Sequence, residues 1–274
     1  MGSLSNYSEN ALVEHLFLEA AYSPTAQLYL ALATSDPGEA ATGASMNEVA
    51  NSGSYARTAI NFAAASSRRV TQTGAVTFPA ASGSWGTVSH WAIVTSATHG
   101  AGNVLAYGAF AVSKSIVSGN TPSVADGEVY VEITASSGLS NYAANGFLDR
   151  MFRNQAFTVS ANYLALTTAT IADTNTGSTI TEVSGNNYSR VQVNATGGGN
   201  PNWESAGTSN ATQNEDAVTF PTASGSWGTL TSVACCDAST NGNLLWYGND
   251  VVDQAVGASD VVSFAAGAID FAQS

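Results

Sequence analysis

A chain of 274 residues, of which only 10% are charged, carries 20 acidic and 7 basic side chains and a formal net charge of −13. Nucleic-acid binding depends on clustered Lys and Arg, and the only adjacent basic pair is Arg68–Arg69, so no nucleic-acid partner is expected. No apolar run approaches the roughly 18 residues of a membrane helix, and the chain opens without the segments of a signal peptide, so we expect a soluble protein made in a cytoplasm.

Two short helices are predicted, one near the start of the chain and one near its middle. Ser5 and Ser140 each stand where an N-cap residue would stabilise a helix. The apolar residues that follow each serine have the spacing of one helical face. They are Leu12, Val13, Leu16 and Phe17 in the first helix and Phe147, Leu148, Met151 and Phe152 in the second.

Strands are predicted after each helix, where the apolar pattern changes to period two between clusters of Gly, Asn, Ser and Pro. The predicted strands are 26–34, 55–63, 88–96, 103–110 and 128–134 in the first half, and 161–169, 188–196, 230–236, 243–248 and 261–272 in the second. The pattern predicts a mainly β protein whose halves are antiparallel β-sandwiches or barrels, each with a short N-terminal helix.

The two halves are copies of one sequence. The segments "AVTFPAASGSWGTV" at 75–88 and "AVTFPTASGSWGTL" at 217–230 share twelve of fourteen residues. Leu4 matches Leu139, 135 residues later, whereas Ala75 matches Ala217, 142 residues later. The growing offset places an insertion in the second copy, within the Gly- and Asn-rich stretch 196–213. The chain is therefore predicted to be two tandem homologous modules, 1–135 and 136–274.

One group of polar residues recurs in both copies. Its members are Glu48, Tyr55 and Arg57 in the first copy and Glu182, Tyr188 and Arg190 in the second. In a chain with so few cations, an arginine kept in both copies indicates a specific role. The prediction is that each arginine ties down the preceding loop through Glu or backbone carbonyls. The alternative is a contact with a partner protein.

The duplicated segment around Trp85 and Trp227 contains no His, Asp, Glu, Cys or Lys. It is therefore unsuited to catalysis, and its Pro and Gly residues favour a turn. We expect each tryptophan to act as a large apolar plug. Stacking of the ring on a ligand is the alternative.

No constellation of residues indicates catalysis or a cofactor. His15, His90 and His99 are scattered and have no histidine counterparts in the second copy, whereas a metal site needs ligands at defined spacings. No pair of carboxylates and no nucleophile triad recurs. The expectation is a protein that is not an enzyme and that uses no metal or cofactor.

Five segments of the first copy are distinctive when taken together, namely "LSNYSENALVEHLF", "YSPTAQLYLALATSDP", "SGSYARTAINF", "AVTFPAASGSWGTVSHWAIV" and "GNVLAYGAF". With these segments the first copy resembles a module of tailed-bacteriophage structural proteins, which are often described as tail-fibre-like. The resemblance spans Leu4 to about Thr134, and the second copy matches more loosely. The resemblance implies a virion component without catalysis, on the exterior of the capsid or tail and made in the host cytoplasm.

Two kinds of virion protein fit this resemblance. A capsid decoration (cement) protein is slightly favoured, because the sequence has no heptad or collagen-like run of the kind that builds a stalk. The alternative is a tail fibre or baseplate protein that binds host surface glycans. Expected partners are major capsid or tail proteins and other copies of the same chain in the particle, with no membrane and no nucleic acid.

Two further classes of function stay open. In a carbohydrate-binding module or adhesin, Trp203 in the insertion is expected to be exposed, so that its ring could stack on a sugar. A hydrolase such as a depolymerase is disfavoured, because no carboxylates cluster in the sequence.

Overall fold

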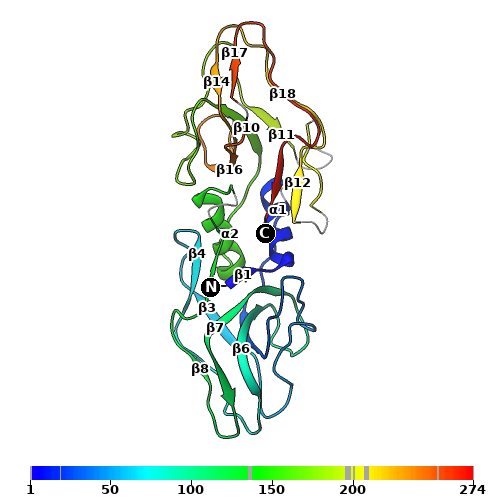
Figure 1. Cartoon of the computed structure of the whole chain (residues 1–274), viewed down its shortest axis with the longest axis vertical. Coiled ribbons are helices and arrows are strands. Elements are labelled where there is room, and N and C mark those ends of the chain that lie inside the picture. Colours follow the sequence, from blue (N-terminus) through cyan, green and yellow to red (C-terminus); the bar gives the residue numbers. More distant parts are fainter. Residues whose placement is uncertain are drawn as a thin grey trace. The chain divides into compact units, whose positions relative to one another are not determined.

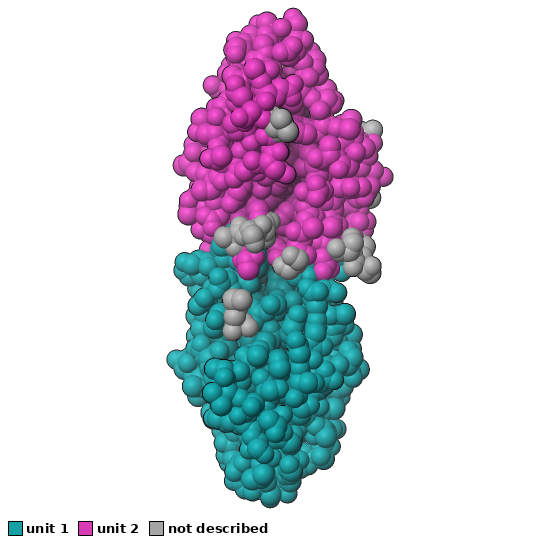
Figure 2. Space-filling model, in the orientation of Figure 1, with its two compact units in different colours: residues 1–11, 23–133, 147–156 teal, residues 12–22, 134–146, 157–274 magenta. Residues whose placement is uncertain are grey.

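The computed structural model describes residues 2–18, 20–134, 138–194, 199, 201–206, 210–251 and 253–273. They form two compact units, shown in different colours in Figure 2. Unit 1 consists of Met1–Ala11, Ser23–Ile133 and Phe147–Ala156, and unit 2 consists of Leu12–Tyr22, Thr134–Gly146 and Phe157–Ser274. Each unit thus takes most of its chain from one copy of the repeat and a shorter segment from the other. The predicted boundary at 135/136 and parts of the insertion (196–198, 200 and 207–209) lie outside the described residues.

Two helices begin directly after the predicted capping serines: α1 (Asn6–Phe17) and α2 (Asn141–Arg153). The hydroxyl oxygen of each serine accepts a hydrogen bond from the backbone N–H three residues later, at 3.4 Å for Ser5 and 3.1 Å for Ser140. Such a bond satisfies one of the free N–H groups of the first helical turn. The apolar residues predicted to share a face are buried in both helices, so the predicted helices are confirmed.

Unit 1 contains a closed barrel with the strand order β1-β7-β6-β2-β3-β4-β9. Strands β1, β3, β4, β6 and β7 are labelled in Figure 1. Neighbouring strands of the barrel are antiparallel, except that β1 and β9 are parallel. The barrel strands are β1 (Gly2–Leu4), β2 (Leu28–Ala33), β3 (Thr58–Phe62), β4 (Arg69–Thr73), β6 (Gly86–Val94), β7 (Val104–Ile116) and β9 (Tyr130–Glu132). A separate antiparallel pair joins β5 (Val76–Thr77) to β8 (Ser123–Val124).

Unit 2 builds the same chain path with shorter strands. Its largest described sheet has the order β11-β10-β15-β16, and three further antiparallel pairs are β12 with β19, β13 with β18, and β14 with β17. The bounds are β10 (Asn162–Thr167), β11 (Val191–Val193), β12 (Ala211–Gln213), β13 (Val218–Thr219), β14 (Gly228–Leu230), β15 (Ser232–Cys236), β16 (Leu244–Gly248), β17 (Gln254–Val256), β18 (Ser263–Phe264) and β19 (Asp270–Ala272). The predicted mainly β class, with two antiparallel modules, is confirmed.

Each unit has an apolar cluster at matching sequence positions. In unit 1 the cluster consists of Ala31, Ala41, Met46, Ala92, Val94 and Val104, and in unit 2 of Ala165, Ile171, Ile180, Ala234, Cys236 and Leu244. Members come both from strands and from the loop that follows β2 or β10. The cluster therefore holds this loop against the sheet in both units, and the recurrent polar residues lie at the end of the same loop.

Candidate functional site

The Arg57 guanidinium lies at the centre of a buried polar cluster in unit 1. Its Nε and Nη2 donate to the two carboxylate oxygens of Glu48, at 2.7 and 2.8 Å. Its Nη1 donates to the carbonyl oxygens of Ser96 and Ala101, at 2.8 and 2.7 Å, and Nη2 also donates to that of Gly43, at 3.1 Å. All five N–H donors of the guanidinium are thus used. The bonds tie two loops to each other and leave no donor for a partner protein.

Tyr55 completes this cluster. Its hydroxyl donates to the Glu48 carboxylate at 2.9 Å and accepts a hydrogen bond from the Leu32 N–H at 2.9 Å. Burial, and then the negative charge of Glu48, raise the pKa of Tyr55 well above the ordinary value of 10.0. The hydroxyl therefore stays protonated and acts as a fixed bridge between strand β2 and the carboxylate.

The second copy repeats the cluster bond for bond. Arg190 binds the Glu182 carboxylate at 2.9 and 2.7 Å and donates to the carbonyl oxygens of Gly177, Ala238 and Asn241 at 2.7 to 2.9 Å. The Tyr188 hydroxyl likewise donates to the Glu182 carboxylate and accepts a hydrogen bond from the Leu166 N–H, both at 2.9 Å. Glu182 is 21% exposed, whereas Glu48 is 4% exposed. The cluster therefore belongs to the module rather than to one copy.

Trp85 and Trp227 pack edge-on against these tyrosines. The ring centroids lie 5.2 Å apart for Trp85 and Tyr55 and 5.3 Å apart for Trp227 and Tyr188. Each indole N–H donates to a backbone carbonyl, of Gly53 at 2.8 Å and of Asn186 at 3.0 Å. Both tryptophans are about 5% exposed, so their rings fill the module interior and offer no face for stacking on a ligand.

Trp203 lies in a different environment from the one expected. The ring is fully buried in unit 2 and packs edge-on against Phe17, with centroids 5.0 Å apart, and against Trp246, with centroids 6.1 Å apart. The expectation of an exposed ring is therefore wrong. The insertion brings Trp203 into an aromatic core, where the ring has no access to a sugar.

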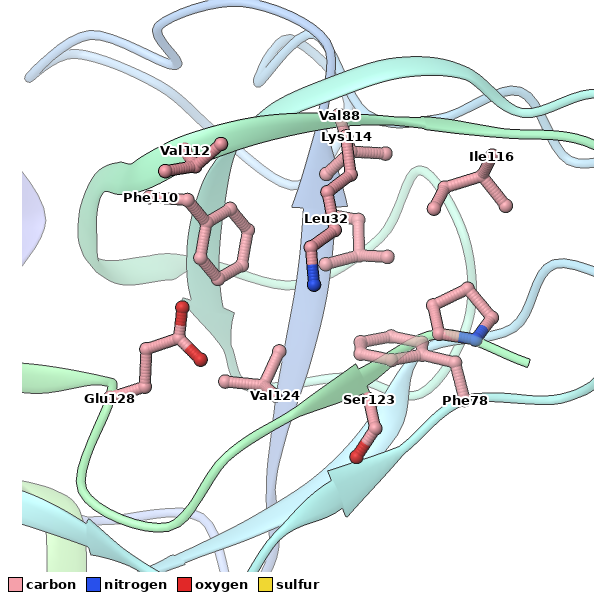
Figure 3. Close-up of a pocket in the computed structure, with 11 residues that line it drawn as sticks. Leu32, Phe78, Val88, Phe110, Val112, Lys114, Ile116, Ser123, Val124 and Glu128 are labelled. Atoms are coloured by element: carbon pink, nitrogen blue, oxygen red, sulfur yellow. The ribbon is translucent and has the colours of Figure 1, made fainter. Parts of the chain in front are cut away.

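A shallow groove lies on unit 1 between β7 and the segment around β8 (Figure 3). Its volume is about 60 Å³, room for only a few waters at roughly 10–15 Å³ each. Lys114 reaches into it from β7, and Glu128 from the segment after β8. We call it the β7 groove. Its apolar lining includes Leu32, Phe78, Val88, Phe110, Ile116 and Val124.

A second hollow in unit 1, with a volume of about 260 Å³, has a polar lining. Its polar side chains are Thr25, Gln27, Asn61, Arg153, Asn154 and Gln155. Below them, Phe62 and Phe152 meet edge-on with centroids 5.3 Å apart. Amide and guanidinium groups are suited to hydrogen bonds with hydroxyl groups. This polar hollow is large enough for part of a small ligand, although it lies below the usual range of about 300–1,000 Å³.

Neither hollow was predicted from the sequence. The signal for the β7 groove lies in the comparison of the copies, where "NVLAYGAFAVSKSIV" at 103–117 aligns with "NLLWYGNDVVDQAVG" at 243–257. Among the described residues, His, Cys, Asp and Glu form no group of three that could hold a metal. In the same part of the chain, no helix is both long and apolar enough to cross a membrane.

Comparison with known proteins gives a family match over both halves of the chain. A family model described as "Podophage GP4 fiber I protein gp80" matches residues 3–132 and again residues 138–272. The two matched stretches coincide with the two copies of the repeat. A search of curated proteins found no match.

Proposed function

Because the chain belongs to the podophage fiber I family through both of its copies, we propose that it is a non-enzymatic fibre component on the exterior of a bacteriophage particle. The double family match is the observation that carries this proposal, and it supports a structural role in the virion. The polar residues that the two copies share are used to hold loops, which also fits a structural protein. In this proposal the chain is made in the host cytoplasm, contacts other virion proteins and needs no cofactor, nucleic acid or membrane.

A fibre role is favoured over capsid decoration. From the sequence alone, decoration has a slight advantage because no stalk-forming repeat is evident. The description of the matching family names a fibre protein, which supports the fibre proposal, and a fibre can be assembled from stacked β modules without a separate stalk. Decoration stays the alternative position for the same structural protein.

The number of copies in each particle distinguishes the two roles. Purified virions would be digested, and peptides of this chain would be quantified against those of the major capsid protein by mass spectrometry. A fibre role predicts far fewer copies than capsid subunits, together with immunogold label at the tail. A copy number close to that of the capsid subunits, with label over the head, would instead establish decoration.

Binding of host surface glycans is a second candidate function, favoured by the polar hollow of unit 1. Its amide side chains and Arg153 surround an opening of about 260 Å³, and amide groups can both donate hydrogen bonds to sugar hydroxyl groups and accept them. A glycan array probed with the purified chain tests this candidate. Asn61→Ala with Gln155→Ala is expected to abolish binding, whereas Asn51→Ala, at an exposed site outside the hollow, is expected to preserve it.

A further inference from the structure

We infer that the β7 groove of unit 1 is a contact surface for a second copy of this chain, in a two-fold arrangement that pairs Lys114 of each copy with Glu128 of the other. The inference goes beyond the proposed function, since it concerns the isolated protein and holds for a fibre or a decoration protein alike. It rests on exposure, on the difference between the two copies of the repeat, and on charge.

Two exposed apolar side chains lie on β7 or directly after it, and one of them, Val112, lines the groove. Val112 is 71% exposed and Val117 is 51% exposed. Val112 lies in a bulge of β7, because Val88 pairs with Lys114 while His90 pairs with Ala109. Four residues of β7 thus lie opposite a single residue of β6. A bulge changes the direction of side chains, and Val112 both lines the groove and is exposed to solvent.

The second copy replaces two of the apolar residues of this region. Leu230 pairs with Gln254 as Val88 pairs with Lys114, so the two hairpins are in equivalent register. Yet Phe110 is replaced by Asp250, and Val117 by Gly257. Val112, by contrast, aligns with another valine, Val252. Because unit 2 forms the hairpin with an acidic residue at the position of Phe110, the Phe110 side chain is not required for this hairpin to fold.

The charges of the groove differ between the copies in the same way. Lys114 is the only lysine of the chain and aligns with Gln254, while Glu128 aligns with Ala268. Both Lys114 and Glu128 are exposed, and neither forms an ion pair within the part of the chain that the structure describes. One carboxylate oxygen of Glu128 accepts a hydrogen bond from the Ala125 N–H at 3.1 Å, which leaves the other oxygen for a partner.

This charge pattern favours a second molecule of the same chain as the partner that fills the β7 groove. In a two-fold contact the same surface meets itself, so that each residue pair occurs twice. A cation and an anion on opposite walls of one apolar groove are complementary to themselves in this arrangement (Figure 3). Association is therefore expected to weaken when either charge is reversed.

Sedimentation velocity of the purified full chain over a range of concentrations tests the apolar part of the contact. The wild type is expected to dimerise, and Phe110→Asp, which introduces the residue type of the second copy, is expected to lower the association constant about tenfold or more. Val261→Asp, at a 49% exposed valine of unit 2, is the matched control and should leave association unchanged. Thermal melting checks that each variant is folded. A wild type that stays monomeric throughout, or a folded Phe110→Asp variant that dimerises normally, would overturn the inference.

Charge reversal tests the pairing itself. Lys114→Glu and Glu128→Lys are each expected to weaken self-association. An equimolar mixture of the two variants should associate again, because Glu at position 114 of one chain then meets Lys at position 128 of the other, and the converse pair is complementary as well. A mixture that does not associate would show that the two charges never meet. The groove would then belong to a different partner, and the two-fold contact would be wrong.

Discussion

At the scale of single residues, the recurrent Tyr and Arg residues act through burial and hydrogen bonding. The sequence itself shows that these residues recur in both copies. The role of Arg57 in tying down a loop through Glu48 could be predicted from that recurrence. The partners Ser96 and Ala101 could not be predicted, because backbone carbonyls carry no residue signature. The burial of Trp203 was also beyond prediction, since an aromatic residue in a Gly-rich insertion has no periodic pattern that indicates a core position.

Loss of the Arg57 side chain is expected to destabilise unit 1 strongly. Arg57→Met removes the arginine partner of the buried Glu48 carboxylate, and loss of one member of a buried ion pair typically costs about 3–5 kcal/mol. Arg190→Met should reduce the free energy of unfolding by less, because Glu182 is 21% exposed and water can replace part of the lost interaction. Urea unfolding followed by tryptophan fluorescence measures both changes. Arg69→Met is the control, since its pair with Glu132 is exposed and is worth about 1 kcal/mol at most.

An unchanged melting temperature for Arg57→Met would contradict the loop-tying role. If that variant also failed to join the particle, Arg57 would have to contact a partner protein instead.

The buried tyrosines are expected to make stability depend on alkaline pH. The pKa values of Tyr55 and Tyr188 lie above 10.0 in the folded protein, so above that pH the unfolded chain loses the proton first. The contribution of the two tyrosines to the free energy of unfolding is therefore complete below about pH 10. It falls as the pH rises further, by up to roughly 1.4 kcal/mol per pH unit for each tyrosine. Urea unfolding between pH 8 and pH 11 measures this slope. The double variant Tyr55→Phe with Tyr188→Phe should show a shallower slope, and an equal slope would contradict the explanation.

At the scale of elements, both helices and strands such as β2 and β10 could be predicted, whereas β4 and the two-residue strands could not. The predicted strand 261–272 forms two strands instead, β18 and β19. Strands β2 and β10 have a clear apolar pattern and lie within the predicted ranges. Strands β5 and β8 have two residues each, too few to establish a period. The docking of the loop after β2 against the β6–β7 loop also leaves little trace in the sequence, apart from one glycine.

Substitution of Gly43 is expected to push the loop after β2 away from the β6–β7 loop. A Cβ atom at Gly43 would lie 2.1 Å from the Ala101 carbonyl oxygen, which also accepts a hydrogen bond from Arg57. Because backbone must move to relieve this contact, Gly43→Ala is expected to cost about 1–3 kcal/mol, measured by urea unfolding. Gly83→Ala is the control, since its nearest neighbour would lie at an ordinary 3.4 Å. Equal effects of the two substitutions would show that the loops are not closely docked.

At the scale of the whole molecule, the repeat and the compact units divide the chain differently. The family model matches 3–132 and 138–272, but unit 1 also includes Phe147–Ala156 and unit 2 also includes Leu12–Tyr22. The spacing of apolar residues predicts that each helix buries a face. It does not indicate which module supplies the residues that cover this face, so the exchange of segments could not be predicted from the sequence.

This exchange predicts that a fragment ending at the repeat boundary lacks part of its core. In unit 1, Phe152 packs edge-on against Phe62, and the Asp149 carboxylate accepts a hydrogen bond from the Ala65 N–H at 2.8 Å. Fragment 1–135 loses these contacts, whereas fragment 1–156 retains them. We expect the shorter fragment to unfold at a lower urea concentration and to bind more of a dye that reports exposed apolar surface. Phe152→Asp within fragment 1–156 should lower its urea midpoint of unfolding towards that of the shorter fragment. Identical unfolding midpoints for the two fragments would instead mean that the first copy folds without the segment from the second.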